Sequence, residues 1–242
     1  MITFIFPIYK QEHVLEKSIT LMDQYLSNNL NEKYEIILCI DGSPGKDLQI
    51  ASELGEQFKT VRIISYKKNM GRGYAIKYAG MNAKGKYIVY MDCDLVEVNY
   101  LKYIDEMIQK VKVNDVVIAS RFLPESHSVR KWKRKLISKS YRILVQIIFR
   151  DFHVTDPDVG FKGIQKECFQ NINLMCNLNG PSWDLQFLVN AHLEGYKITE
   201  FPFQYIENYE LTTVNILTGS IIEFLGLIYI KVTSIISKYA IF

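Results

Sequence analysis

Short apolar runs alternate with segments of helical periodicity along the first half of this chain. Runs of mainly apolar residues predict buried strands at 2–6, 35–40, 61–64, 87–91 and 116–119. Between them, apolar residues recur every three or four positions, which predicts helices at 12–26, 47–58, 74–83 and 101–110. Repeated strand–helix units of this kind predict an α/β fold in which helices flank a central, mainly parallel sheet.

The regular alternation ends after residue 121. A basic stretch with helical spacing follows at 131–150, a further helix is predicted at about 183–193, and a strand-like segment at 196–203 precedes an apolar tail. A chain of 242 residues is long enough for one substantial core. We therefore predict one α/β domain over residues 1–210 and an apolar or amphipathic tail over residues 211–242.

The tail lacks the uninterrupted run of roughly 18 apolar residues that a membrane span needs, because Glu223, Lys231 and Lys238 break it. In a helix over 220–238, the polar residues fall within one stripe, and Ile, Leu, Phe and Tyr occupy the rest. We predict that this helix lies on a membrane surface; packing on the domain or in a homo-oligomer are the alternatives. The cations of residues 130–135 offer a second, electrostatic attachment.

Composition narrows the class of protein. A content of 48% hydrophobic and 23% charged residues excludes disordered and fibrous classes. Four cysteines without C-x-x-C spacing argue against a zinc site. The net charge is only +3, and the basic cluster comes without a motif for reading bases, so we expect no nucleic-acid partner. Because the first strand begins at Ile2, there is no room for a signal peptide, and we expect a cytoplasmic protein.

A polar or glycine-rich segment follows each of the first five predicted strands. In chain order they are Pro7 and Tyr9, Asp41, Asn69 with Gly71 and Gly73, Asp92 with Asp94, and Ser120 with Arg121. In an open α/β sheet, ligands bind beyond the carboxyl ends of the strands. The sequence therefore predicts one crevice that these strand ends share.

Asp92 and Asp94 leave the end of the fourth predicted strand together. A pair of carboxylates, completed by diphosphate oxygens and water, suits a hard cation such as Mg²⁺ or Mn²⁺. A solvated turn is the alternative for an isolated D-x-D, because Asp is common at strand ends. The other strand ends favour the metal site.

Two further strand ends carry groups that suit a nucleotide. The Asp41 carboxylate precedes a sharp turn, where it can accept hydrogen bonds from a base or ribose, or cap the turn. Gly71 and Gly73 flank Arg72, and this loop can bring backbone amides and a guanidinium to a phosphate. It is not a dinucleotide fingerprint, because Ile76 stands at the position of the third glycine.

The ordered motifs resemble glycosyltransferase family 2, and within it the polyprenyl-phosphate sugar synthases of the dolichyl-phosphate mannose synthase type. The resemblance covers most of residues 2–205. It rests on Phe6 to Tyr9 with Glu12, Ile40 to Ser43, Asn69 with Gly71 and Gly73, Asp92 to Leu95, Ser120 with Arg121, and Asp156-Pro157 with Gly160 to Lys162. There are two departures: Ile40 stands where the family usually has an acidic residue, and Val96 where mannose synthases often have Gln.

The resemblance implies a GT-A fold and a nucleotide-sugar donor. It implies that Pro7, Tyr9, Glu12 and Asp41 face the nucleoside and that Asn69, Gly71 and Gly73 belong to the donor site. By the same resemblance, Asp92 lies near the sugar and diphosphate, and Asp94 holds the metal.

The acceptor side is read from residues later in the chain. Transfer to a sugar hydroxyl needs a general base, for which Asp184 is the candidate. A phosphate acceptor is already anionic and needs cations instead; Arg121, Arg134 and Ser138 are the candidates, the last two sharing one helical face. A solvated basic helix is the alternative.

These inferences lead to one expected function. We expect an inverting transfer of a hexose from a UDP- or GDP-sugar to polyprenyl phosphate, at the inner face of the cell membrane. Transfer to a saccharide hydroxyl in capsule, lipopolysaccharide or teichoic-acid synthesis is the first alternative. A sugar nucleotidyltransferase and a non-catalytic nucleotide-sugar binder are the others.

Overall fold

The computed structural model describes residues 1–96, 98–129, 132–206 and 216–239. Its centre is a seven-stranded sheet in the order β3-β2-β1-β4-β7-β5-β8. The strands are β1 (Ile2–Ile8), β2 (Tyr34–Asp41), β3 (Val61–Tyr66), β4 (Tyr87–Met91), β5 (Val116–Ser120), β7 (Phe161–Gln165) and β8 (Ile198–Pro202). A second, two-stranded sheet joins β6 (Ser128–Val129) to β9 (Tyr205–Ile206).

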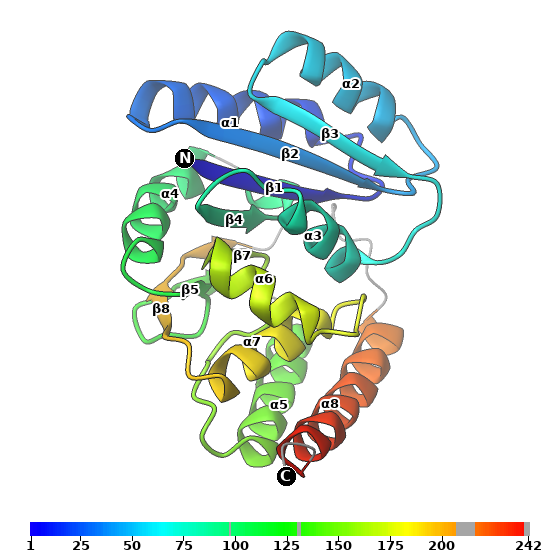
Figure 1. Cartoon of the computed structure of the whole chain (residues 1–242), viewed down its shortest axis with the longest axis vertical. Helices are drawn as coiled ribbons and strands as arrows, with labels where there is room; N and C mark the ends of the chain where they lie inside the picture. Colours follow the sequence, from blue (N-terminus) through cyan, green and yellow to red (C-terminus); the bar gives the residue numbers. More distant parts are fainter. Residues whose placement is uncertain (97, 130–131, 207–215, 240–242) are drawn as a thin grey trace.

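Helices cover this sheet on both faces (Figure 1). They are α1 (Leu15–Asn29), α2 (Asp47–Gln57), α3 (Arg72–Met81), α4 (Val98–Val111), α5 (Trp132–Ile148), α6 (Lys166–Leu174), α7 (Trp183–Leu193) and α8 (Ile216–Tyr239). A single 3₁₀ turn, η1 (Cys93–Leu95), follows β4. The predicted α/β architecture is confirmed, and the predicted strands and helices are all present, with bounds shifted by a few residues.

The sequence missed β7 and α6. β7 runs antiparallel to both β4 and β5 and separates them, whereas all other pairings in the large sheet are parallel. Its apolar pattern is broken by Lys162 and Gly163, so it does not read as a buried run. Gly163 packs closely against α4, because a Cβ there would lie 2.7 Å from the sulfur of Met107. The loop before β7 consequently enters at the edge where β4 and β5 end.

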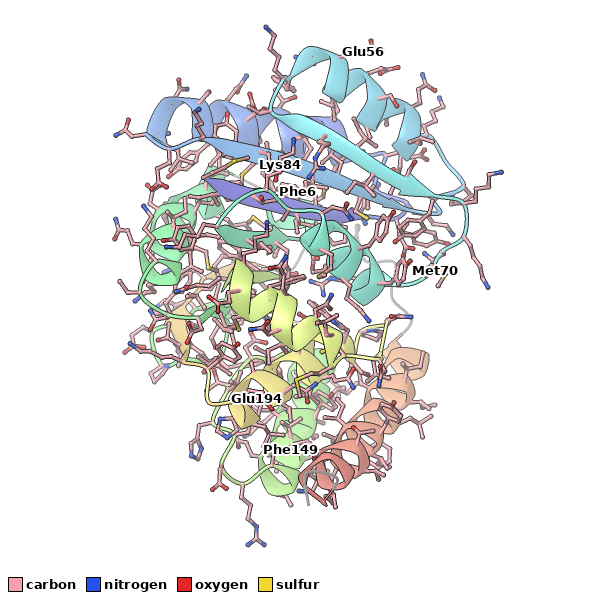
Figure 2. The ribbon with its side chains drawn as sticks, in the orientation of Figure 1. Phe6, Glu56, Met70, Lys84, Phe149 and Glu194 are labelled. Atoms are coloured by element: carbon pink, nitrogen blue, oxygen red, sulfur yellow. The ribbon has the colours of Figure 1, made fainter. Side chains whose placement is uncertain are left out.

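The core lies within the sheet layers, where Phe6 on β1 is fully buried (Figure 2). α5 and α8 pack side by side at the opposite end of the molecule from α1 and α2 (Figure 1). α8 also contacts α7. Among the helices that the structure describes, none is both long enough and apolar enough to cross a bilayer.

α8 packs with its polar stripe toward the protein. Gly226, Leu227 and Ile230 are buried, and Glu223 and Lys231 beside them are half-buried. The large apolar residues of the helix are instead exposed: Ile221, Ile222, Phe224, Leu225, Ile228, Tyr229, Val232 and Ile235. A helix stabilised only by packing on a domain has the reverse orientation. These exposed residues form a continuous apolar patch on the helix, whereas isolated apolar residues on a protein surface are ordinary.

Candidate functional site

The loops after β1 and β2 are tied together at the edge of the sheet. Glu12 accepts a hydrogen bond from the Lys46 N–H at 2.9 Å. Gly45 lies against the same carboxylate, because a Cβ there would be 2.8 Å from Glu12 Oε2. Pro7, in β1, and Tyr9, directly after β1, are both partly exposed. The nucleoside contacts expected of Pro7, Tyr9 and Glu12 stay predictions, and Glu12 has a structural bond of its own.

Asp41 organises the loop that precedes α3. Its side chain is buried, and its two carboxylate oxygens accept the N–H groups of Met70 at 2.6 Å and Gly71 at 2.9 Å. The Asn69 amide donates to the Asp41 carbonyl at 3.2 Å. In the structure the Asp41 carboxylate therefore holds the loop before α3, and not the turn that directly follows Asp41. A contact between Asp41 or Asn69 and a nucleoside stays a prediction.

Gly71 and Gly73 allow α3 to approach the segment before α7. Gly71 has φ +99°, a left-handed conformation that favours glycine, and a Cβ there would lie 2.7 Å from the Asn179 carbonyl. A Cβ on Gly73 would lie 2.4 Å from the Trp183 Cβ. Since the Gly71 amide is already bonded to Asp41, the expected phosphate contact of this amide is not supported. That of Gly73 stays a prediction.

Asp92 and Asp94 leave β4 as expected and enter η1. The Asp92 side chain is 34% exposed, and Asp94 is partly exposed. Gly160, just before β7, lies directly against the Asp92 carboxylate, because a Cβ at Gly160 would fall 1.8 Å from Asp92 Oδ2. The Asp92 N–H also donates to the Gly160 carbonyl at 2.9 Å. The residue that precedes the missed strand β7 thus helps to position the first aspartate of the motif.

Arg72 connects Asp92 to a buried group of charges. Its Nε donates to Asp92 Oδ1 at 2.8 Å, and its Nη1 donates to Asp184 Oδ2 at 2.5 Å. The other oxygen of Asp184 accepts hydrogen bonds from the Lys162 ammonium at 2.6 Å and the Tyr90 hydroxyl at 2.5 Å. Burial alone would lower the pKa of Arg72, but the two carboxylates outweigh it and raise that pKa. The guanidinium is therefore a fixed cation beside Asp92.

The geometry argues against Asp184 as the general base. Its side chain is only 2% exposed, and both oxygens are occupied by the donors of Arg72, Lys162 and Tyr90. Burial would raise the pKa of Asp184, but Lys162 and Arg72 outweigh burial and hold the pKa below its usual range. A base needs an accessible lone pair and a pKa near the working pH. In this structure Asp184 anchors two cations, and its expected role as the general base stays a prediction that this geometry does not favour.

Arg121 lies at the end of β5 in a separate ion pair. Its Nε and one Nη each donate to the Asp156 carboxylate at 2.8 Å, and its backbone N–H donates there as well. Asp156 is 1% exposed and Arg121 is 15% exposed. A guanidinium has five N–H donors, so the remaining ones are free of Asp156. Binding of an acceptor phosphate by Arg121 stays a prediction, to be made with these remaining donors.

The other two candidates for the acceptor phosphate lie on α5. Ser138 is half-buried on this helix. The backbone of Arg134 belongs to α5, but its side chain lies outside the described residues. The helical relation expected from their four-residue spacing is confirmed by the helix itself. Their contact with phosphate stays a prediction.

Three acidic or phenolic groups face one another where the loop before β7, α5 and α8 meet. Asp158 belongs to the loop before β7, Tyr141 to α5 and Glu223 to α8. Burial, followed by the charge of Glu223, raises the pKa of Asp158 to about 8. Burial also raises the pKa of Glu223 and of Tyr141. The contact between α8 and the domain therefore includes two carboxyl groups that repel each other when both are ionised.

Asp92 and Asp94 are the two candidate metal ligands at this edge, and their role stays a prediction. Within the described ranges, no group of three or more His, Cys, Asp or Glu side chains is arranged to hold a metal ion. Mg²⁺ commonly takes one or two protein carboxylates and completes its shell with phosphate oxygens and water. The donor set at this sheet edge fits a cation of that kind, brought together with a diphosphate.

Sequence reasoning did not assign roles to Lys162, Tyr90 or Gly160, and it gave Arg72 only a phosphate contact. The Arg72–Asp184 bond joins residues 112 positions apart, so no local pattern could reveal it. Lys162 gave one usable signal: it is a charged residue next to Phe161 and Gly163 in an otherwise apolar context. A charge that is fully buried requires a charged partner.

Comparison with known proteins was made with this geometry in hand. The sequence description of the family "Glycosyl transferase family 2" matches residues 3–172. Glycosyltransferase AglD of Haloferax volcanii is 27% identical over 204 residues, which are 83% of this chain and 32% of that protein. The dolichyl-phosphate beta-glucosyltransferases ALG5D of Trichomonas vaginalis and that of Dictyostelium discoideum are each 24% identical, over 85% of this chain and 66% of theirs.

Solved structures support the fold. Glucosyl-3-phosphoglycerate synthase from Mycobacterium tuberculosis, in complex with Mn²⁺, UDP and phosphoglyceric acid, superposes with a TM-score of 0.72 at 15% identity. The superposition covers 96% of this chain and 78% of that one. The same enzyme was also solved with Mg²⁺ and UDP. This likeness establishes the GT-A fold, in which those structures hold a divalent cation with a nucleoside diphosphate.

Proposed function

The chain belongs to glycosyl transferase family 2, and from this premise we propose that it transfers a hexose from a UDP- or GDP-sugar to a polyprenyl phosphate. The observation that carries the choice of acceptor is the state of Asp184. With both oxygens occupied and its pKa lowered, this residue offers no base for a neutral hydroxyl. A phosphate oxygen is ionised near neutral pH and needs no base to attack.

The donor half of the proposal rests on the sheet edge. The nucleoside would lie along the ends of β1 and β2, near Tyr9 and Asp41, and the diphosphate near Asp92 and Asp94. When bound there, Mg²⁺ or Mn²⁺ would supply Lewis-acid stabilisation of the departing diphosphate. Arg72 is fixed by Asp184, and so places a permanent cation beside Asp92 without reorganising during the reaction.

The acceptor half rests on the cations around β5 and α5. The acceptor phosphate would be positioned by Arg121, Arg134 and Ser138, with one of its oxygens facing the anomeric carbon. Attack from the side opposite the diphosphate forms the new C–O bond as the old one breaks, and the configuration inverts. The main role of these residues would be to hold the acceptor phosphate in line with the anomeric carbon and the departing diphosphate.

A lipid acceptor requires access to a bilayer, and the orientation of α8 supports this. The exposed apolar residues of α8 and α5 together fit the interfacial region of a membrane, with the catalytic edge beside it. The relatives named dolichyl-phosphate beta-glucosyltransferases favour the same acceptor class. The proposed location is therefore peripheral, at a membrane surface on the side where nucleotide sugars are available.

The test is release of nucleoside diphosphate from a panel of UDP- and GDP-hexoses. Each donor is incubated with the protein, with and without Mg²⁺ or Mn²⁺, and with undecaprenyl phosphate or a soluble oligosaccharide. We expect metal-dependent release that undecaprenyl phosphate stimulates. Stimulation by the oligosaccharide alone would favour transfer to a saccharide hydroxyl. Consumption of NTP and sugar phosphate would favour a nucleotidyltransferase. Binding of the donor without release of nucleoside diphosphate would favour a non-catalytic protein.

A further inference from the structure

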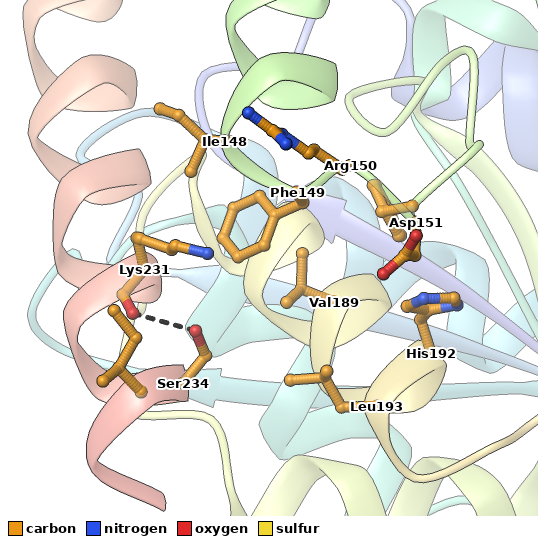
Figure 3. Close-up of a pocket in the computed structure, with 11 residues that line it drawn as sticks. Ile148, Phe149, Arg150, Asp151, Val189, His192, Leu193, Lys231 and Ser234 are labelled. Atoms are coloured by element: carbon orange, nitrogen blue, oxygen red, sulfur yellow. Dashed lines mark hydrogen bonds between the residues drawn. The ribbon is translucent and has the colours of Figure 1, made fainter. Parts of the chain in front are cut away.

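We propose that the cavity between the ends of α5 and α8 is a second, non-catalytic site that binds the phosphate headgroup of an anionic membrane lipid. The cavity has a volume of about 310 Å³. It is lined by Val189 and Leu193 of α7, Phe149 just after α5, and Lys231 and Ile235 of α8. Figure 3 shows the Lys231 side chain pointing toward the Phe149 ring. The inference rests on the membrane position proposed above and on no part of the transfer reaction.

Lys231 gives the cavity its charge. The ammonium lies 5.2 Å from the centre of the Phe149 ring, which holds it at the cavity rather than out in solvent. Within the part of the chain that the structure describes, no carboxylate lies within ion-pair distance of this ammonium. Arg150 and His192 also line the cavity, and the one acidic residue, Asp151, is drawn beside His192 in Figure 3. The lining is therefore net cationic and suits an anion.

The surroundings select a lipid rather than a soluble anion. Ile147 on α5 is 63% exposed, and Val232 and Ile235 on α8 are 49% and 43% exposed. A ligand that places a phosphate at Lys231 can lay its acyl chains along these side chains. Phosphate groups and the first carbons of acyl chains lie together at the depth that an interfacial helix occupies.

This cavity is distinct from the site at the sheet edge. Lys231 follows Glu223 by eight residues on α8, which is about 12 Å along a helix. Glu223 is the residue of α8 that faces the loop before β7 and therefore the catalytic edge. A lipid at Lys231 would fix the distance of that edge from the bilayer without entering it.

The experiment is flotation of the full chain with vesicles, in the absence of donor and acceptor. Vesicles of phosphatidylcholine are compared with the same vesicles containing phosphatidylglycerol. The variant Lys231→Met removes the charge and keeps the aliphatic stem over Phe149; Lys139→Met, at an exposed lysine of α5, is the matched control. Thermal unfolding of each variant checks that the fold is intact, and Lys231→Arg should restore binding.

We expect several-fold stronger binding to the anionic vesicles for the wild type and for Lys139→Met, and loss of most of that increment in Lys231→Met. Equal losses in both variants would mean general charge attraction, and no loss in either would mean that Lys231 is not used; each overturns the inference. Binding to neutral vesicles without any anionic increment would overturn it while leaving membrane association intact. If soluble inorganic phosphate protects the protein from thermal unfolding as well as anionic vesicles do, the site is for free phosphate and the lipid assignment is wrong.

Discussion

The sheet edge and the α5–α8 pair differ in which groups they bury: the sheet edge buries charged groups, and the α5–α8 pair exposes large apolar ones. At the sheet edge, Lys162 and Asp184 are almost completely buried and are satisfied by one another and by Arg72. On α5 and α8, large apolar side chains are exposed, and Lys231 has no carboxylate partner among the described residues. The charges of the first region are paired within the chain. By the proposals above, an apolar and anionic membrane surface covers the second.

This difference separates two uses of a charge. A buried ion pair contributes little net stability, because desolvation offsets the Coulomb attraction, but removing one partner is costly. Such a group fixes geometry, here the position of Arg72 beside Asp92. An unpaired cation at an apolar surface fixes nothing within the chain, and its energy is realised on binding.

The largest expected effect is on stability, at Asp184. Asp184→Asn keeps the shape but leaves Lys162 and Arg72 without their shared anion, so we expect a loss of about 3–5 kcal/mol in the free energy of unfolding. Urea unfolding measures it. A general base would behave differently: turnover would fall while the urea midpoint stayed near that of the wild type. That outcome would restore the role that the structure argues against.

Asp94 should show the opposite pattern. Asp94→Asn removes the proposed metal ligand from a partly exposed turn, so we expect metal-dependent release of nucleoside diphosphate to fall by about 100-fold or more. The urea midpoint should change little. Glu56→Gln, at an exposed residue of α2 (Figure 2), is the control. Turnover of Asp94→Asn at the wild-type rate would remove Asp94 from the metal site.

The exposed face of α8 predicts a moderate effect on membrane binding. Leu225 is 59% exposed, and inserting a side chain of this size into an apolar phase is worth about 1.5–3 kcal/mol. Leu225→Ser should therefore weaken binding to neutral vesicles by roughly tenfold or more. Its effect on stability should stay within about 0.5 kcal/mol. Leu174→Ser, at a more exposed leucine of α6, should leave vesicle binding unchanged; equal losses in the two variants would mean that α8 is not the contact.

The last expected effect is a pH dependence of stability at Asp158. Its pKa is raised to about 8 by burial and by Glu223, so the folded state holds a proton that the unfolded state releases near pH 4. Stability must then fall as the pH rises from about 4 to 8 and level off above. Other groups facing Asp158, namely Asp156, Lys162 and Asp184, remain in the variant.

Asp158→Asn should remove this contribution. Relative to the wild type, the melting temperature of the variant should rise progressively between pH 4 and 8, reaching a gain of roughly ten degrees. Below pH 4 the difference should stay constant. A difference that is the same at every pH would show that Asp158 ionises normally in the folded protein.

Much of the fold could be read from the chain because its signals are local. Runs such as Tyr87–Met91 are apolar enough to indicate buried strands without reference to the rest of the chain. β7 escaped because Lys162 and Gly163 interrupt it, and both are there for tertiary reasons: one pairs with Asp184, the other makes room for Met107. A residue chosen for a distant partner looks like an exception in a local pattern.

In the candidate site, too, the local features could be predicted from the sequence and the long-range contacts could not. Asp92 and Asp94 carry their signal in three consecutive residues, and their position at a strand end follows from the sheet. The ion pairs of Asp184 could not be predicted, because its partners, Arg72 and Lys162, lie elsewhere in the chain. The sequence also showed the polar stripe of α8, but it did not show that this stripe would face the protein. Only the packing of α8 reveals which side is left exposed.

The most direct test of the proposed reaction is transfer of labelled hexose into the lipid phase. Purified protein is given the donor found by the nucleotide-release panel, Mg²⁺ or Mn²⁺, and either polyprenyl phosphate or the matching polyprenol, which lacks the phosphate. We expect lipid-extractable label with polyprenyl phosphate and none with polyprenol, because the attacking group is a phosphate oxygen and no base is in place to activate an alcohol. Equal labelling of the polyprenol, or label found only in a soluble saccharide, would contradict it.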